Sequence, residues 1–123
     1  MSNKEQERRK FPRIKDKGVS VQFKFEGLSA ITKSLDISAS GIYCKITEQI
    51  PLMTKLEIVL ALPSEHGSSR PTLIDIEGVV VREHPVIQNG RADHYDIAIF
   101  FTNLMPKDRE KLVKYIDKRS SNN

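Results

Sequence analysis

Residues 18–27, Gly-Val-Ser-Val-Gln-Phe-Lys-Phe-Glu-Gly, alternate apolar and polar side chains with a period of two. This period places one set of side chains on each face of an extended chain, as in a strand with one face buried. Glu26 and Gly27 follow with residues suited to a turn. The stretch therefore predicts a half-buried β-strand that ends in a turn.

Similar patterns recur along the chain and predict five further strands. The alternation is least regular in the second strand, where Ile31 and Leu35 oppose Ala30 and Ser34. Asn89-Gly90 suits a hairpin tip, and a glycine inside a strand, here Gly78, often marks a bulge. A polar loop over 63–71, expected to be mobile, separates two strands. The strands are expected over 29–37, 42–46, 56–62, 74–81 and 95–101.

The C-terminal segment has helical features. Pro106 suits a first helical position, and Asp108 lies in the first turn, where an acidic side chain is favoured. Leu112, Val113 and Ile116 form an apolar stripe. Six strands followed by one helix predict an all-β fold, a six-stranded antiparallel β-barrel with a C-terminal α-helix over 106–118. Residues 120–123 are expected to fray.

The composition bounds the class of protein. A chain of 123 residues with 38% hydrophobic and 29% charged residues is the size of one globular domain. It has no run of about 18 apolar residues, which a membrane helix requires, and its polar first residues do not resemble a secretory signal. Cys44 is the single cysteine, which excludes an internal disulfide, and its apolar neighbours predict a structural thiol. These features favour a cytoplasmic protein without membrane insertion, metal or cofactor.

The positive charge is concentrated near the N-terminus. Residues 1–17 hold seven Lys/Arg and three Asp/Glu, which accounts for the whole formal net charge of +4. The rest of the chain is neutral overall. A neutral body with a short basic arm favours a small anion over DNA or RNA as the partner.

Two short motifs have functional chemistry. In Arg9-Lys-Phe-Pro-Arg13, the proline disfavours a helix, so the segment is expected to be an extended arm. Arginine pairs with phosphate oxygens or with O6 and N7 of guanine. In Asp36-Ile-Ser-Ala-Ser-Gly41, a carboxylate is available for the N–H groups of guanine, Ser38 offers a hydroxyl, and Gly41 permits positive φ or close approach of a ligand to the backbone. Alone, each also fits a solvated tail or an ordinary turn.

Together, the two motifs resemble the double motif of the PilZ family, Arg-x-x-x-Arg followed by Asp-x-Ser-x-x-Gly. The resemblance extends over about residues 8–117 and includes the strand that ends at Arg82. It implies a six-stranded barrel with a C-terminal helix that binds the second messenger cyclic di-GMP through Arg9, Arg13, Asp36, Ser38 and Gly41. It also implies that an arginine before the motif, here Arg8, accompanies binding of two stacked ligand molecules. Arg82 is a weaker candidate.

The resemblance divides the chain into a flexible tail (1–7), a PilZ domain (8–119) and a frayed end (120–123). Within the domain, a ligand-binding arm (8–17), a barrel (18–102) and the helix (106–118) are expected. The expected function is a receptor, not an enzyme, that orders its arm on ligand binding and signals to an unidentified protein partner. Two alternatives stay open: a protein-interaction adaptor without ligand, and a small barrel that binds single-stranded nucleic acid.

Overall fold

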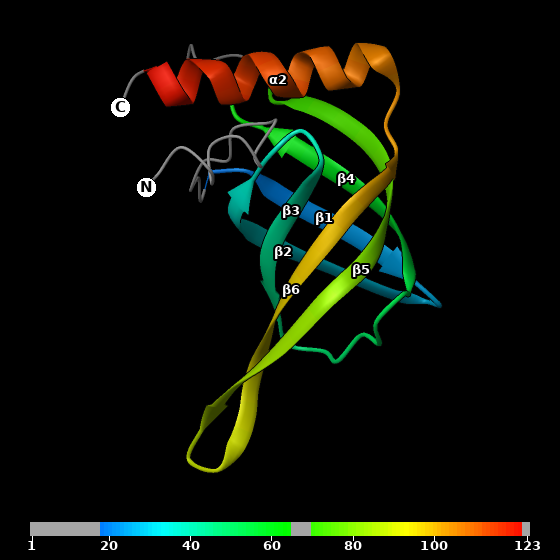
Figure 1. The fold of residues 1–123 in the computed structure, drawn as a ribbon, viewed down its shortest axis with the longest axis vertical. Coiled ribbons are helices and arrows are strands. Elements are labelled where there is room, and N and C mark those ends of the chain that lie inside the picture. Colours follow the sequence, from blue (N-terminus) through cyan, green and yellow to red (C-terminus); the bar gives the residue numbers. More distant parts are fainter. Residues whose placement is uncertain (1–17, 65–69, 122–123) are drawn as a thin grey trace, which may run out of the picture.

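Six antiparallel strands form a closed barrel in the order β1-β2-β3-β6-β5-β4. The computed structural model describes residues 18–64 and 70–121. The helix α2 (Pro106–Ser121) lies across one end of the barrel (Figure 1). The predicted fold and the predicted number of strands are confirmed. The strands are β1 (Ser20–Phe25), β2 (Leu28–Ile37), β3 (Gly41–Ile46), β4 (Lys55–Leu62), β5 (Thr72–Gln88) and β6 (Arg91–Asn103).

Two tight hairpins have the expected turn residues. Glu26 and Gly27 connect β1 to β2 with φ values of 45° and 82°, and Asn89 and Gly90 connect β5 to β6 with φ values of 53° and 77°. Two consecutive residues with positive φ match the twist of antiparallel strands, and glycine adopts this conformation at the lowest cost. Both turns predicted from the sequence are confirmed.

The core is formed by the inward positions of all six strands and is closed at one end by α2. Val21 and Phe23 of β1 are fully buried, as their alternation predicted. From α2, Leu112 and Ile116 are also buried in the core cluster. Each such side chain contributes about 1.5–3 kcal/mol by leaving water. The helix is therefore an integral part of the core.

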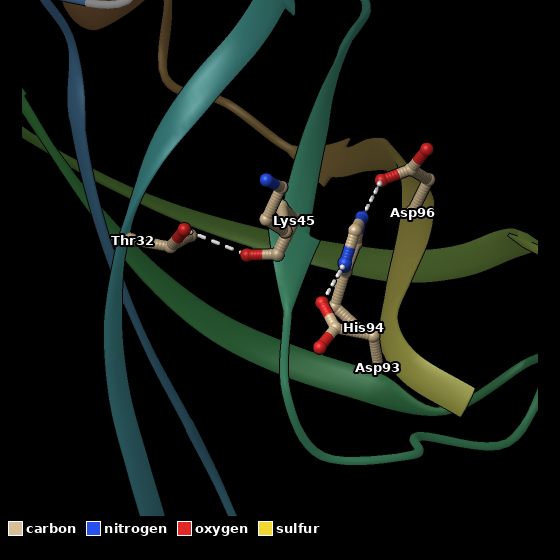
Figure 2. A network of polar contacts seen from close by, with 5 residues as sticks. All are labelled: Thr32, Lys45, Asp93, His94 and Asp96. Carbon is tan, nitrogen blue, oxygen red and sulfur yellow. Dashed lines mark hydrogen bonds and ion pairs between the residues drawn. The ribbon is translucent and has the colours of Figure 1, made fainter. Parts of the chain in front are cut away.

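Strand β2 departs from simple alternation. Ile31 is 70% exposed, whereas the polar Ser34 is fully buried. A register shift between Ser34 and Asp36 resets the alternation, so that Ile37 points inward again. Where the main-chain ladder to β3 stops, the Thr32 hydroxyl donates a 2.6 Å hydrogen bond to the Lys45 carbonyl (Figure 2).

Strands β5 and β6 continue as a long hairpin beyond the barrel (Figure 1). The predicted irregularity at Gly78 is confirmed by a register shift between Glu77 and Gly78. His94 lies on this hairpin, and its side chain is only 12% exposed. Its Nδ1 lies 2.8 Å from Asp93 Oδ2 and its Nε2 lies 3.6 Å from Asp96 Oδ1 (Figure 2). Both ring nitrogens therefore face carboxylates of the same strand.

The end of α2 lies further along the chain than expected. The helix reaches Ser121, three residues beyond the predicted end at 118. Lys118 and Arg119 occupy the last turn, where positive charge is favoured. The Arg119 guanidinium also lies 5.0 Å from the centre of the Tyr115 ring. Ser120 and Ser121 are thus helical rather than part of a frayed tail.

Cys44 is a buried thiol of β3, which confirms the structural role expected for it. Burial, with a smaller contribution from the charge of Asp96, raises the pKa of Cys44 to about 12. The thiol therefore stays protonated in the folded chain, whereas an unfolded cysteine loses its proton near pH 9.0.

We expect Cys44 to make stability fall at alkaline pH. Its contribution is complete below pH 9.0 and is lost as the pH rises towards 12, because only the unfolded state releases the proton in between. Urea unfolding of wild type and Cys44→Ala measures the effect. The advantage of wild type should shrink by at least about 1 kcal/mol between pH 8 and pH 10.5. A constant difference would contradict the assignment.

Candidate functional site

A tight turn connects β2 to β3 and contains two of the predicted site residues. The Ser38 amide donates to the Gly41 carbonyl at 2.9 Å, and the Ser40 amide donates to the Ser38 hydroxyl oxygen at 3.2 Å. The Ser40 carbonyl accepts from the Phe101 amide of β6 at 2.9 Å. Ser38 is only 2% exposed. Its hydroxyl oxygen bonds within the turn and therefore shapes it.

Gly41 allows β3 to approach β6 closely. A Cβ atom at this position would lie 2.5 Å from the Ile99 carbonyl oxygen, a distance that real Cβ atoms do not adopt. The sequence offered positive φ or close approach as reasons for this glycine. Gly41 does not have a positive φ, since Gly27 and Gly90 are the glycines with positive φ in the described chain. The first of these two reasons is therefore wrong. The close approach that the structure describes is that of the β6 backbone rather than that of a ligand.

Asp36 lies on the outer surface of the barrel, at an open hollow of about 470 Å³. The register places Asp36 opposite Tyr43 of β3 and Tyr43 opposite Ala98 of β6. Ala98 in turn lies opposite Arg82 of β5. Asp36 is therefore one end of a row of side chains that crosses four strands. The lining residues are Asp36, Tyr43, Val81, Arg82 and Ala98.

Arg82 lies at the opposite end of this row. It is exposed, and its side chain makes no hydrogen bond or ion pair with any residue that the structure describes. The structure thus brings Asp36 and Arg82 to one hollow and places Ser38 and Gly41 in the adjoining turn. Arg8, Arg9 and Arg13 lie outside the described residues, as do the expected tail and arm.

Sequence reasoning missed three residues of the hollow: Tyr43, Val81 and Ala98. Tyr43 had a detectable signal, since it lies between the inward residues Ile42 and Cys44 and must face outward if the period of two holds. Ala98 had the same signal, since it lies between the inward residues Ile97 and Ile99, whereas Val81 had none, because it is the extra residue of a register shift.

A second hollow, of about 510 Å³, lies on the outer face of β1, β4 and β5. Its lining includes three carboxylates, from Glu57, Asp75 and Glu77, and one cation, from Lys24. Although this hollow is somewhat larger, its negative charge repels a phosphate-bearing ligand. The hollow at Asp36 and Arg82 is therefore the better candidate for such a ligand.

Two further classes of site were searched for in the described residues. The ranges 18–64 and 70–121 contain no group of three or more His, Cys, Asp or Glu side chains suited to a metal ion. Among the helices described, none has the length and apolarity needed to cross a membrane.

Residues 7–118 match the model of the PilZ domain, so the chain belongs to the PilZ domain family. The resemblance seen in the sequence is confirmed. A comparison with curated proteins finds no match.

Solved structures with the same fold include three PilZ proteins. MotI/DgrA of Bacillus subtilis, an inhibitor of motility, is 22% identical with a TM-score of 0.77 over 93% of this chain and 52% of its own. MrkH of K. pneumonia in complex with c-di-GMP is 18% identical with a TM-score of 0.73 over 93% of this chain and 53% of its own. The PilZ domain of Escherichia coli YcgR with c-di-GMP is 14% identical with a TM-score of 0.65 over 94% of this chain and 95% of its own. The chain thus spans about half the length of MotI and MrkH.

The close approach at Gly41 generates a prediction about stability. Gly41→Ala should destabilise the fold by about 1–3 kcal/mol, because the new methyl group meets the rigid backbone of β6. Gly78→Ala is the comparison, because a methyl group there would first meet side-chain atoms, Ile99 Cγ2 at 2.6 Å and Ile58 Cδ1 at 3.0 Å, and would meet the backbone only at the Phe100 carbonyl oxygen, at 3.1 Å. Urea unfolding should show the larger loss for Gly41→Ala. An equal or smaller loss would contradict the explanation.

Proposed function

We propose that this chain is a receptor for cyclic di-GMP and that its function is binding rather than catalysis. The observation that carries the proposal is the Asp36 carboxylate at the open hollow of the barrel surface, beside the turn formed by Ser38 and Gly41. Membership of the PilZ family supports it. The solved complexes of MrkH and of the YcgR PilZ domain with c-di-GMP add to this support.

The chemistry of the motif residues fits the two halves of the ligand. Asp36 accepts hydrogen bonds from guanine N1–H and the exocyclic amine, which are donors on the Watson–Crick edge. Ser38 and Gly41 hold the turn in a shape that admits the guanine. Arg9 and Arg13 pair with phosphate oxygens or with guanine O6 and N7 from the opposite side.

Arg8 extends this arrangement to a second molecule of ligand. Two cyclic dinucleotides stacked on each other present more phosphate oxygens than two arginines can pair with, and Arg8 supplies a further planar donor. We therefore expect two molecules of cyclic di-GMP per chain.

The signal is an ordering of residues 8–17. This segment is rich in cations and has few apolar anchors, so without an anionic ligand it gains little by packing on the barrel. Ligand binding fixes it through charged hydrogen bonds and creates a new surface for a protein partner. The identity of that partner depends on the pathway that the receptor serves.

Calorimetric titration with cyclic di-GMP tests the receptor function and its stoichiometry. Wild type should bind two ligands per chain, and Arg9→Ala, Arg13→Ala and Asp36→Asn should each weaken binding by one to two decades, since each removes a charged hydrogen bond of about 1.5–3 kcal/mol. Asp75→Asn is the matched control for Asp36→Asn, because Asp75 is an exposed carboxylate of the second hollow. Absence of binding by wild type at micromolar concentration would refute the receptor function, and a ratio near one would refute the role of Arg8.

Amide hydrogen exchange tests the proposed signal. Saturating cyclic di-GMP should slow exchange of residues 8–17 strongly, because ordering buries or hydrogen-bonds their amides. Residues of the central barrel strands should change little. Unchanged exchange of 8–17 in the presence of bound ligand would refute the ordering step and leave the binding function intact.

A further inference from the structure

The row of outward side chains that begins at Asp36 ends at a second charged group, and the two ends have opposite charge. Asp36, Tyr43, Ala98 and Arg82 follow one another on four neighbouring strands, β2, β3, β6 and β5. Adjacent strands lie about 4.8 Å apart, so the row is roughly 14 Å long. One open hollow of about 470 Å³ is lined by all four residues, a volume within the usual range for small-molecule sites.

A β-bulge directs each end of the row outward. In β2, the register passes from Ser34 opposite Cys44 to Asp36 opposite Tyr43. One residue is therefore skipped, and Asp36 takes an outward position that regular alternation would have made inward. Bulges of this kind redirect side chains and are frequent beside binding sites.

The same irregularity recurs at the other end. In β5, the register passes from Val80 opposite Ile99 to Arg82 opposite Ala98, and Val81 is the extra residue. Val80 is fully buried, so regular alternation would direct Arg82 into the core. The bulge instead gives Arg82 an outward position beside Ala98. Two independent bulges thus aim a carboxylate and a guanidinium at the same hollow.

The middle of the row leaves room between these charges. Ala98 has the smallest side chain of the four and lies between Tyr43 and Arg82. The Tyr43 ring, half-buried beside it, offers an apolar face against which a base can stack. No group of the described chain pairs with the Arg82 side chain, so none of these residues competes with a ligand for its five N–H donors.

We propose that Arg82 is a ligand-binding residue and that the row Asp36–Tyr43–Ala98–Arg82 forms the floor of the site. This inference rests on the proposed binding of cyclic di-GMP and adds three residues of the barrel to those of the two motifs. Asp36 takes the N–H donors of a guanine at one end. The Arg82 guanidinium pairs with two acceptors of the ligand at the other end, either phosphate oxygens or guanine O6 and N7. The site therefore requires a ligand with a donor edge and an acceptor pair, both within reach of one row.

Titration of full-length variants with cyclic di-GMP tests the role of Arg82. Arg82→Ala should weaken binding at least tenfold. Arg91→Ala removes the same charge from the exposed tip of the β5–β6 hairpin and should bind within twofold of wild type. Arg82→Lys keeps the charge but loses the planar pair of donors, so its affinity should fall between those of wild type and Arg82→Ala.

A second pair of variants tests the space above Ala98 independently of charge. Ala98→Leu fills the centre of the hollow and should weaken binding at least tenfold. Ala92→Leu is the matched control on the exposed hairpin. Circular dichroism and thermal unfolding establish that each variant is folded.

The outcomes separate this inference from the proposed function. If wild type binds and Arg82→Ala and Ala98→Leu both bind within twofold of it, the receptor function stands and the row is refuted. Equal losses in Arg82→Ala and Arg91→Ala would also refute it, since they would show a general effect of charge. If wild type does not bind cyclic di-GMP at all, both the function and the row are refuted.

Discussion

Because the sheet is closed, each strand residue directs its side chain either into the core or to the outer surface of the barrel. The fold and the site both depend on this constraint. Val21 and Phe23 fill the core because alternation is kept in β1. Asp36 and Arg82 reach the surface because alternation is interrupted in β2 and β5. Alternation of side chains thus builds the hydrophobic interior, and the two bulges that interrupt it place charged side chains at a hollow on the outer surface.

Regular patterns in the sequence were sufficient for the six strands, both tight hairpins and the helix. They failed where pairing between strands decides whether a side chain is buried or exposed. Ile31 is exposed and lies opposite Gln22 of β1, whereas Ser34 is buried and lies opposite Cys44 of β3, so the register with neighbouring strands overrides hydrophobicity, and no local pattern contains this information. Sequence reasoning identified Arg82 only as a weaker candidate, because its outward position opposite Ala98 depends on a bulge that no local pattern reveals.

Charge distribution separates the two hollows of the barrel more clearly than size does. The acidic hollow on β1, β4 and β5 is the larger, yet its three carboxylates oppose an anionic ligand. The hollow on β2, β3, β6 and β5 combines a carboxylate and a guanidinium, which suits a ligand that has both hydrogen-bond donors and negative charge. A purely anionic ligand would meet repulsion at Asp36, and a cation would meet it at Arg82. The proposed binding of a guanine nucleotide is consistent with this balance.

The buried thiol of Cys44 has a practical consequence for spectroscopy of this protein. Because the only native cysteine is shielded and protonated, a cysteine introduced on the surface is the one that a maleimide or nitroxide reagent modifies in the folded chain. A fluorophore or spin label can then be attached at a chosen point without first removing Cys44. Distances between a labelled segment and the barrel become measurable in a chain whose core packing is untouched.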